Sequence, residues 1–256
     1  MTSLPIYHDL DGVSVFITGG GSGIGAALTE GFLRHGAKVT FVQRSDASDF
    51  VTEMAEQTGN RPRFIQCDIT DISALQASIV EAGASNGPVQ VLVNNAANDQ
   101  RHGLHEADED YWDRMIAINL KAYFFAAQAA APMMREAGGG SIINYTSISY
   151  MMGNAGYPIY TAANSGINGL TRSLARELGP DKVRVNAIAP GWVMTQKQRD
   201  LWVTDAALAE HLERQCLKET LDPQDLVGGT LFLASDASRM MTGQALVIDG
   251  GVVVTG

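Results

Sequence analysis

A glycine-rich turn between an apolar run and a helical pattern constrains the fold of this chain more than any other feature. The β-branched run Val13–Thr18 leads directly into the letters GGGSGIG at residues 19–25. A helical pattern comes next, with Leu28 and Phe32 on one face. Glycines in such a turn let the backbone approach a pyrophosphate, and the N-terminus of the helix supplies free N–H groups. The strand before the turn and the helix after it favour a dinucleotide site over an ordinary glycine loop.

Strand-like and helix-like segments alternate along the rest of the chain. Strands are expected at Val13–Thr18, Lys38–Gln43, Arg63–Cys67, Val89–Asn94, Ser141–Thr146, Arg184–Ala189 and Ala245–Ile248, and helices at Ile24–His35, Ala47–Thr58, Ile72–Glu81, Glu109–Glu136, Tyr157–Leu178 and Pro223–Ala234. This alternation predicts one α/β domain over residues 1–256, with a doubly wound parallel sheet of about seven strands and helices on both faces.

Composition excludes several classes of protein. The 256 residues carry a net charge of −10, which argues against nucleic acid and anionic membranes as partners. No segment is long and apolar enough to span a bilayer, and Met1–Gly12 shows no secretory signal. Cys67 and Cys216 have neither metal-ligand nor disulfide spacing, so no metal and a reducing, cytoplasmic location are expected.

Six motifs, in order along the chain, resemble those of the short-chain dehydrogenase/reductase family over essentially its full length. They are TGxxxGxG at Thr18–Gly25, the acidic-apolar pair Asp68-Ile69, an NNAG-like strand end at Asn94–Ala97, the active-site positions Asn119, Ser147 and Tyr160, a PGxxxT-like loop at Pro190–Thr195, and Asp249–Gly251. The resemblance implies a Rossmann fold and a nicotinamide cofactor. The cofactor contacts it implies are Gly19, Gly21, Ser22, Gly23, Ile24, Gly25, Asp68, Ile69, Asn95, Ala96, Pro190, Gly191, Val193 and Thr195, together with Tyr160 and Asn164.

Roles for the active-site residues derive from this resemblance and from their chemistry. Tyr160 is expected to take a proton from the substrate hydroxyl as a phenolate, or to return it as a phenol in reduction. Ser147 is expected to hold the same oxygen, and Asn119 to support a relay water through its backbone. A lone tyrosine on a helix would more often be a half-buried aromatic, but the serine thirteen residues before it and the glycine turn favour catalysis. His102 and His105 are expected at the surface or the substrate rim.

Asn164 departs from the family pattern, in which a lysine holds the nicotinamide ribose and stabilises the tyrosinate. An amide can keep a ribose hydrogen bond but supplies no charge. Tyr160 is therefore expected to titrate near its free pKa of about 10. Lys121 is a candidate replacement cation. The open explanations are a natural variant with slow or high-pH activity, a binding protein, and an inactivating substitution.

Cofactor choice depends on the end of the second expected strand. An NAD site usually places a carboxylate there, whereas Gln43 is neutral and Arg44 comes directly after it. Arg44 could pair with a 2′-phosphate, which favours NADP. In the alternative, Arg44 is a solvated loop residue, Asp46 binds the ribose and NAD is the cofactor.

The substrate is expected to be a sugar. The segments Asn98–His102, Ser147–Tyr150 and Gln215–Lys218 resemble bacterial aldose 1-dehydrogenases of the D-xylose type, which implies oxidation of a C1 hydroxyl to a lactone. Reduction of another carbonyl and a non-catalytic binding role are the alternatives. The candidate substrate residues are Asn98, Arg101, Ser149, Asn154 and Trp192, although Ser149 could instead make a local turn hydrogen bond.

Two further expectations concern architecture. Residues 192–218 form the least regular long segment and are predicted to be a lid over the carboxyl ends of the strands. The family resemblance implies a homotetramer built on Glu109–Glu136 and Tyr157–Leu178, with the C-terminal strand at a second contact.

Overall fold

The computed structural model describes residues 5–254 and contains one seven-stranded parallel sheet with the order β3-β2-β1-β4-β5-β6-β7. Its strands are β1 (Ser14–Thr18), β2 (Lys38–Gln43), β3 (Arg63–Gln66), β4 (Val91–Asn94), β5 (Gly140–Tyr145), β6 (Val183–Pro190) and β7 (Ala245–Ile248). The predicted α/β class, parallel sheet and number of strands are confirmed. Part of the segment expected to lack a secretory signal, Met1–Gly12, lies outside the described residues.

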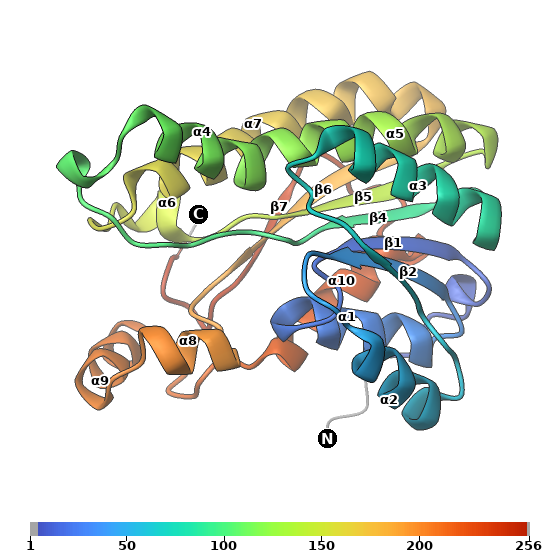
Figure 1. Ribbon diagram of the computed structural model, residues 1–256. Helices are drawn as coiled ribbons and strands as arrows, with labels where there is room; N and C mark the ends of the chain where they lie inside the picture. The colour runs from blue at the N-terminus through green and yellow to red at the C-terminus, as the bar shows by residue number, and fades with distance from the viewer. Residues whose placement is uncertain (1–4, 255–256) are drawn as a thin grey trace.

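Helices cover both faces of the sheet (Figure 1). One face carries α1 (Gly23–Arg34), α2 (Ser48–Thr58) and α10 (Val227–Ala234), and the other carries α3 (Ile72–Asn86), α4 (Glu109–Ile116), α5 (Ala122–Glu136) and α7 (Pro158–Leu178). The remaining helices are α6 (Ser149–Met152), α8 (Gln196–Leu201) and α9 (Asp205–Arg214). No helix within residues 5–254 has the length and apolar character needed to cross a membrane.

Alternation along the central strand divides the core in two. Val15 and Ile17 of β1 belong to the apolar cluster shared with α1 and α10, whereas Phe16 belongs to the cluster shared with α3 and α5. All three side chains are at most 1% exposed. Successive strand residues point to opposite faces, so an uninterrupted apolar strand is buried by helices on both sides.

The long helix predicted at Glu109–Glu136 is interrupted, which corrects the sequence prediction. A π-helical turn, Ala117–Lys121, separates α4 from α5 and contains the buried Asn119. The Asn119 side chain donates to the carbonyl of Asn98 and accepts from its N–H, at 3.0 and 2.8 Å. Such turns are common at functional sites because they redirect one helical residue.

Smaller differences occur at the ends of elements. α3 continues five residues beyond the predicted Glu81, and Gly87, with φ of 91°, ends it. The last predicted helix begins with a 3₁₀ turn, Pro223–Leu226. The irregular segment 192–218 holds the two helices α8 and α9, which lie apart from the sheet (Figure 1).

Candidate active site

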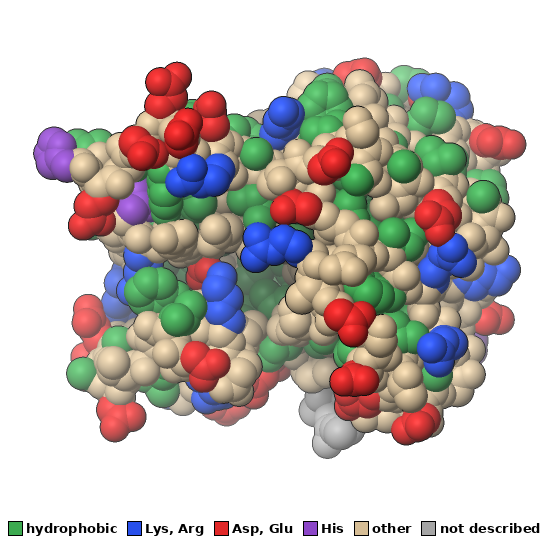
Figure 2. Space-filling view, viewed as in Figure 1, with side chains coloured by type: hydrophobic (Ala, Val, Ile, Leu, Met, Phe, Trp, Pro, Cys, Tyr) green, Lys and Arg blue, Asp and Glu red, His purple; other side chains and the backbone are tan. Residues whose placement is uncertain are grey.

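A cavity of about 680 Å³ lies at the carboxyl ends of the central strands. Its walls come from the turn after β1, the segments after β4, β5 and β6, and helices α7, α8 and α9. Figure 2 shows the molecule hollowed where the α8–α9 segment faces the rest of the body, with basic and acidic side chains at the rim. This edge of a doubly wound sheet is where ligands bind in such folds.

Most of the predicted site residues line this cavity. All four catalytic candidates do so: Asn119, Ser147, Tyr160 and Asn164. Among the predicted cofactor contacts it also includes Gly19, Ser22, Gly23, Ile24, Asn95, Ala96, Pro190, Gly191, Val193 and Thr195. Of the substrate candidates, Arg101, Ser149, Asn154 and Trp192 line it. Gly21, Gly25, Gln43, Arg44, Asp68, Ile69 and Asn98 are not part of its lining.

The glycine turn is shaped for close approach of a ligand. A Cβ atom on Gly25 would stand 1.9 Å from the Gly19 carbonyl oxygen, so only glycine lets the turn pack against the start of α1. The Asn95 side chain donates to the carbonyl oxygens of Thr18 and Gly19, at 3.0 and 3.3 Å, and holds the turn against β4. The residue before α1, Ser22, makes no side-chain capping hydrogen bond within the described chain. The N–H groups and dipole of α1 therefore fit a pyrophosphate.

The end of β2 has a structural task as well. Gln43 Oε1 accepts from the Gly21 N–H at 3.1 Å, and Gln43 Nε2 donates to the carbonyl of Ser45. The pKa of Asp68 is lowered, chiefly by a hydrogen bond from the Thr70 N–H. The positive charge of the exposed Arg44 adds to this effect. Gln43 thus orients the glycine turn and leaves the exposed Arg44 to supply positive charge at this strand end.

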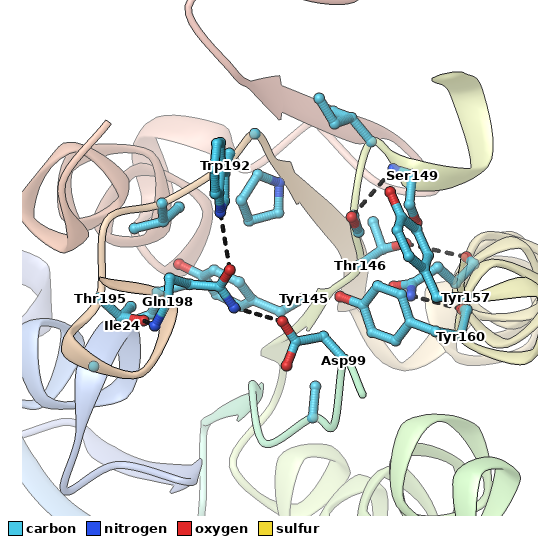
Figure 3. Close-up of a pocket in the computed structure, with 18 of the residues that line it drawn as sticks. Ile24, Asp99, Tyr145, Thr146, Ser149, Tyr157, Tyr160, Trp192, Thr195 and Gln198 are labelled. Carbon is cyan, nitrogen blue, oxygen red and sulfur yellow. Dashed lines mark hydrogen bonds between the residues drawn. The ribbon is translucent and has the colours of Figure 1, made fainter. Parts of the chain in front are cut away.

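Tyr160 and Ser147 line the same cavity, and the close-up shows the Tyr160 ring with Tyr157 and Asp99 as neighbours (Figure 3). Ser147 Oγ accepts from the N–H of Ser149 at 3.1 Å, which leaves its hydroxyl proton available for a ligand. The Asn164 side chain is 2% exposed and donates to the carbonyl of Tyr160 at 2.8 Å. The amide is therefore engaged with its own helix and brings no charge to the phenol.

The expectation that Tyr160 titrates near pH 10 is wrong. Burial raises the pKa of Tyr160 to about 12, and the nearby Asp99 carboxylate adds to the rise, while Ser147 and Asn164 act in the opposite direction. Lys121, the suggested substitute cation, is exposed and does not line the cavity. A different lysine, Lys197 of α8, does line it. The expected value of about 10 allowed for the missing lysine charge at position 164 but not for the burial of Tyr160.

Asn98 and His102 serve the scaffold. Asn98 is the backbone partner of Asn119, and its side-chain oxygen accepts from the Gln100 N–H at 3.1 Å. His102 is 5% exposed and packs against Tyr111, which corrects its expected surface position, whereas His105 is exposed. These contacts hold the loop after β4 in place.

The Gln215–Lys218 motif is also structural. Gln215 is buried, and its amide donates to the carbonyl of Glu219 at 2.7 Å. Lys218 Nζ donates to the carbonyls of Leu212 and Glu213, at 2.9 and 2.8 Å, and so closes the end of α9. This motif supports the α8–α9 segment without lining the cavity.

Several lining residues were not proposed from the sequence, namely Lys197, Gln198, Trp202, Glu210, His211 and Arg214. Ala207, Glu210, His211 and Arg214 recur at helical spacing, which could have indicated one face of α9. Asp99 accepts from Lys197 Nζ at 2.7 Å and from Gln198. Burial alone would raise the pKa of Asp99, but the hydrogen bonds and charge of Lys197, with Gln198, lower it below its usual value.

Three buried polar atoms that line or adjoin the cavity have no protein partner among the described residues. They are Ser149 Oγ, Trp202 Nε1 and His211 Nε2. Ser149 makes the expected local turn hydrogen bond through its N–H, to Ser147 Oγ, while its hydroxyl is buried without a partner. Burial lowers the pKa of His211, which keeps the ring neutral and able both to donate and to accept. These three atoms are shielded from the cavity as the side chains stand, but the hydrogen-bonding residues that line it, among them Arg101, Asn154 and Glu210, suit a polar ligand.

A dinucleotide cradle beside a tyrosine–serine pair defines an oxidoreductase that uses a nicotinamide dinucleotide. A family model described as enoyl-(acyl carrier protein) reductase matches residues 19–253. The chain belongs to the short-chain dehydrogenase/reductase family, and it is a dehydrogenase acting on CH–OH groups.

Individual relatives agree over nearly the whole chain. It is 50% identical to the probable galactose dehydrogenase GalD of Rhizobium meliloti over 96% of this chain and 97% of that protein. It is 44% identical to the D-xylose 1-dehydrogenase of Caulobacter vibrioides over 97% and 99% of the two chains. A blue fluorescent protein from a metagenomic library, solved with NADPH, matches with a TM-score of 0.88 and 34% identity over 96% and 100%.

Proposed function

We propose that this protein oxidises the C1 hydroxyl of an aldose to a lactone with a nicotinamide dinucleotide, preferring NADP. The observation that carries the proposal is the set of hydrogen-bonding residues that line the cavity together with the tyrosine–serine pair, among them Arg101, Asn154 and Glu210. A polyhydroxylated ligand would form hydrogen bonds with such residues, whereas a steroid or fatty acyl chain would bury them without partners. The relatives named as galactose and D-xylose dehydrogenases support the same substrate class.

The proposed roles distribute one proton and one hydride. Tyr160 as phenolate takes the proton from the C1 hydroxyl, and Ser147 donates a hydrogen bond to the same oxygen. The nicotinamide, when bound, is the acceptor of the hydride that leaves C1. The C–H and O–H bonds break as the lactone carbonyl forms. The π-helical turn places Asn119 at the cavity, where its backbone is proposed to hold a relay water.

The residues at the glycine turn are proposed to bind the cofactor. Gly19 to Gly25 and the start of α1 would hold the pyrophosphate. Asn164, Val193 and Thr195 line the same cavity as Tyr160 and would contact the nicotinamide half. Asp68 and the buried Ile69, at the end of β3, are proposed for the adenine.

A second candidate function is binding without turnover. It is favoured by burial, which raises the pKa of Tyr160 to about 12, and by Asn164, which stands where a lysine on the same helix could have lowered it. A homotetrameric assembly and a cytoplasmic location remain predictions. Trp112 of α4 and Phe124 of α5, which are 47% and 42% exposed, lie on helices expected at the tetramer contact.

A substrate panel tests the proposed function. The protein and its Asn164→Lys variant are incubated with aldoses, polyols, hydroxy acids and hydroxysteroids, and formation of reduced cofactor is followed. Aldoses are expected to exceed the other classes by at least about tenfold in kcat/KM, because unmet buried polar groups cost about 1–3 kcal/mol each. The aldose assignment would be contradicted if a hydroxysteroid were oxidised fastest, or if a simple ketone were reduced faster, with reduced cofactor, than any aldose is oxidised. Binding of both ligands without turnover by either protein would favour the second candidate.

Arg44 is expected to decide cofactor preference. Arg44→Ala should weaken NADP binding by about tenfold to a hundredfold, since a hydrogen bond to a charged group contributes about 1.5–3 kcal/mol, and should change NAD binding little. Calorimetric Kd values for both cofactors measure this. Arg61→Ala removes an exposed arginine located before β3 and serves as the matched control. Equal losses for NADP and NAD would show that Arg44 does not meet a 2′-phosphate.

A further inference from the structure

A chain of hydrogen bonds crosses from the α8 segment to the loop after β4. Trp192 Nε1 donates to Gln198 Oε1 at 2.9 Å, and Gln198 Nε2 donates to Asp99. Lys197 Nζ donates to the other carboxylate oxygen of Asp99 at 2.7 Å. Both oxygens of Asp99 are thus occupied by neighbouring residues of one short helix. The lysine and the aspartate are 98 positions apart in sequence.

The same carboxylate faces the tyrosine. In Figure 3, Asp99 lies between Gln198 and the phenol ring of Tyr160, and all three side chains line the cavity. A negative charge here opposes formation of the phenolate, and it is the largest charge effect acting on Tyr160. The Lys197 side chain is 52% exposed and that of Asp99 is 29% exposed, so this bridge lies at the rim, where it can open.

We propose that Lys197 and Gln198 are positioning residues that act through Asp99: they fasten α8 over the cavity and neutralise the carboxylate that faces Tyr160. This inference rests on the proposed role of Tyr160 as the base. When the bridge is closed, Asp99 is paired and Tyr160 ionises more readily. When α8 lifts away, Lys197 leaves with it, and the unpaired carboxylate suppresses the phenolate. Docking of the helix thereby couples closure of the site to activation of its base.

The other charged and titratable groups around Tyr160 do not replace Lys197. They are Tyr157 at the start of α7, Tyr123 of α5, Tyr145 of β5, Glu210, His211 and Arg214 of α9, and Arg101 in the loop after β4. Burial raises the pKa values of Tyr123 and Tyr145, which are therefore neutral at ordinary pH, and burial lowers the pKa of His211, which keeps that ring neutral. Arg101 lies 4.5 Å from the centre of the Trp202 ring, and Glu210 and Arg214 are one turn apart on α9. Only Lys197 forms an ion pair with Asp99 in the described part of the chain.

Lys197→Met tests the inference, with Arg199→Met as the matched control. Arg199 is a cation on the same helix, but it pairs with Asp222, at 3.5 Å, outside the cavity. Two readouts are used: hydrogen exchange of the α8–α9 amides, and the pH profile of turnover with the best substrate of the panel. Lys197→Met is expected to speed exchange in α8 and to move the alkaline rise in rate upward by about one pH unit, or about tenfold in rate at a given pH. Arg199→Met should leave the profile in place.

Asp99→Asn completes the test. It removes the charge that faces Tyr160, so the rise should move to lower pH, and adding Lys197→Met to it should then shift the profile far less than in the parent protein. The inference would be overturned if Lys197→Met shifted the pH profile equally in the parent protein and in Asp99→Asn. It would also be overturned if Lys197→Met matched the parent protein in both hydrogen exchange and pH profile. Loss of turnover at every pH in Asp99→Asn would also overturn it, since the carboxylate would then act directly on substrate. Hydrogen exchange needs no substrate. It therefore tests whether Lys197 holds α8 in place even if the protein does not oxidise aldoses.

Discussion

Asn164→Lys is expected to raise the rate of alcohol oxidation about a hundredfold at neutral pH. In the proposed mechanism oxidation needs Tyr160 as phenolate, and burial raises its pKa to about 12, so the rate should rise about tenfold for each pH unit below that value. A cation ~5 Å from the phenolate contributes about 3 kcal/mol at an effective dielectric near 20, which equals roughly two pKa units. The alkaline rise should therefore move about two pH units downward. Initial rates across the pH range measure both effects.

The control for this change is Asn164→Met, which has a side chain of similar length to lysine and no charge. It also removes the hydrogen bond from the Asn164 amide to the Tyr160 carbonyl, as lysine does. If lysine acts through its charge, methionine should leave the pH profile where it is or move it upward. An Asn164→Lys protein that is no faster than the parent, with an unshifted profile, would show that position 164 does not limit the reaction. The binding role would then be favoured.

Tyr160→Phe is expected to lower turnover by about a thousandfold or more in both the parent and Asn164→Lys backgrounds. Loss of a general acid–base group typically costs about 10²–10⁴ in rate, and phenylalanine keeps the ring but removes the oxygen that accepts the proton. Cofactor binding should persist, because the glycine turn and the start of α1 remain intact. Single-turnover rates and calorimetry with the dinucleotide separate the two effects.

Tyr150→Phe is the matched control, because Tyr150 loses the same hydroxyl but does not line the cavity. Its turnover should stay close to that of the parent. Retention of more than about a tenth of the activity by Tyr160→Phe would mean that another group accepts the proton. His211, whose ring is held neutral by burial, and Asp99 are the groups in the same cavity to test next.

Local patterns that need no tertiary information were enough to predict the fold. Val13–Thr18 is mainly apolar and β-branched, which indicated a strand, and the glycine turn after it indicated a helix whose N-terminus can bind a phosphate. The π-helical turn could not be predicted in this way. It depends on the amide of Asn119 bonding to the backbone of Asn98, 21 positions away, and the apolar pattern of Glu109–Glu136 continues through it.

For the candidate site too, some properties could be predicted from the sequence and others depend on the tertiary structure. Sequence alone determined that Ser147, Tyr160 and the glycine turn belong to one oxidoreductase, because motif spacing reports chemistry, and it showed that Asn164 brings no charge. Only the tertiary structure decided how acidic Tyr160 is, since its pKa depends on burial and on Asp99, a residue far away in the chain. It also showed that a lysine does line the cavity, on α8 instead of α7. Electrostatic fields act through space over a few ångströms, so groups brought together only by folding determine them.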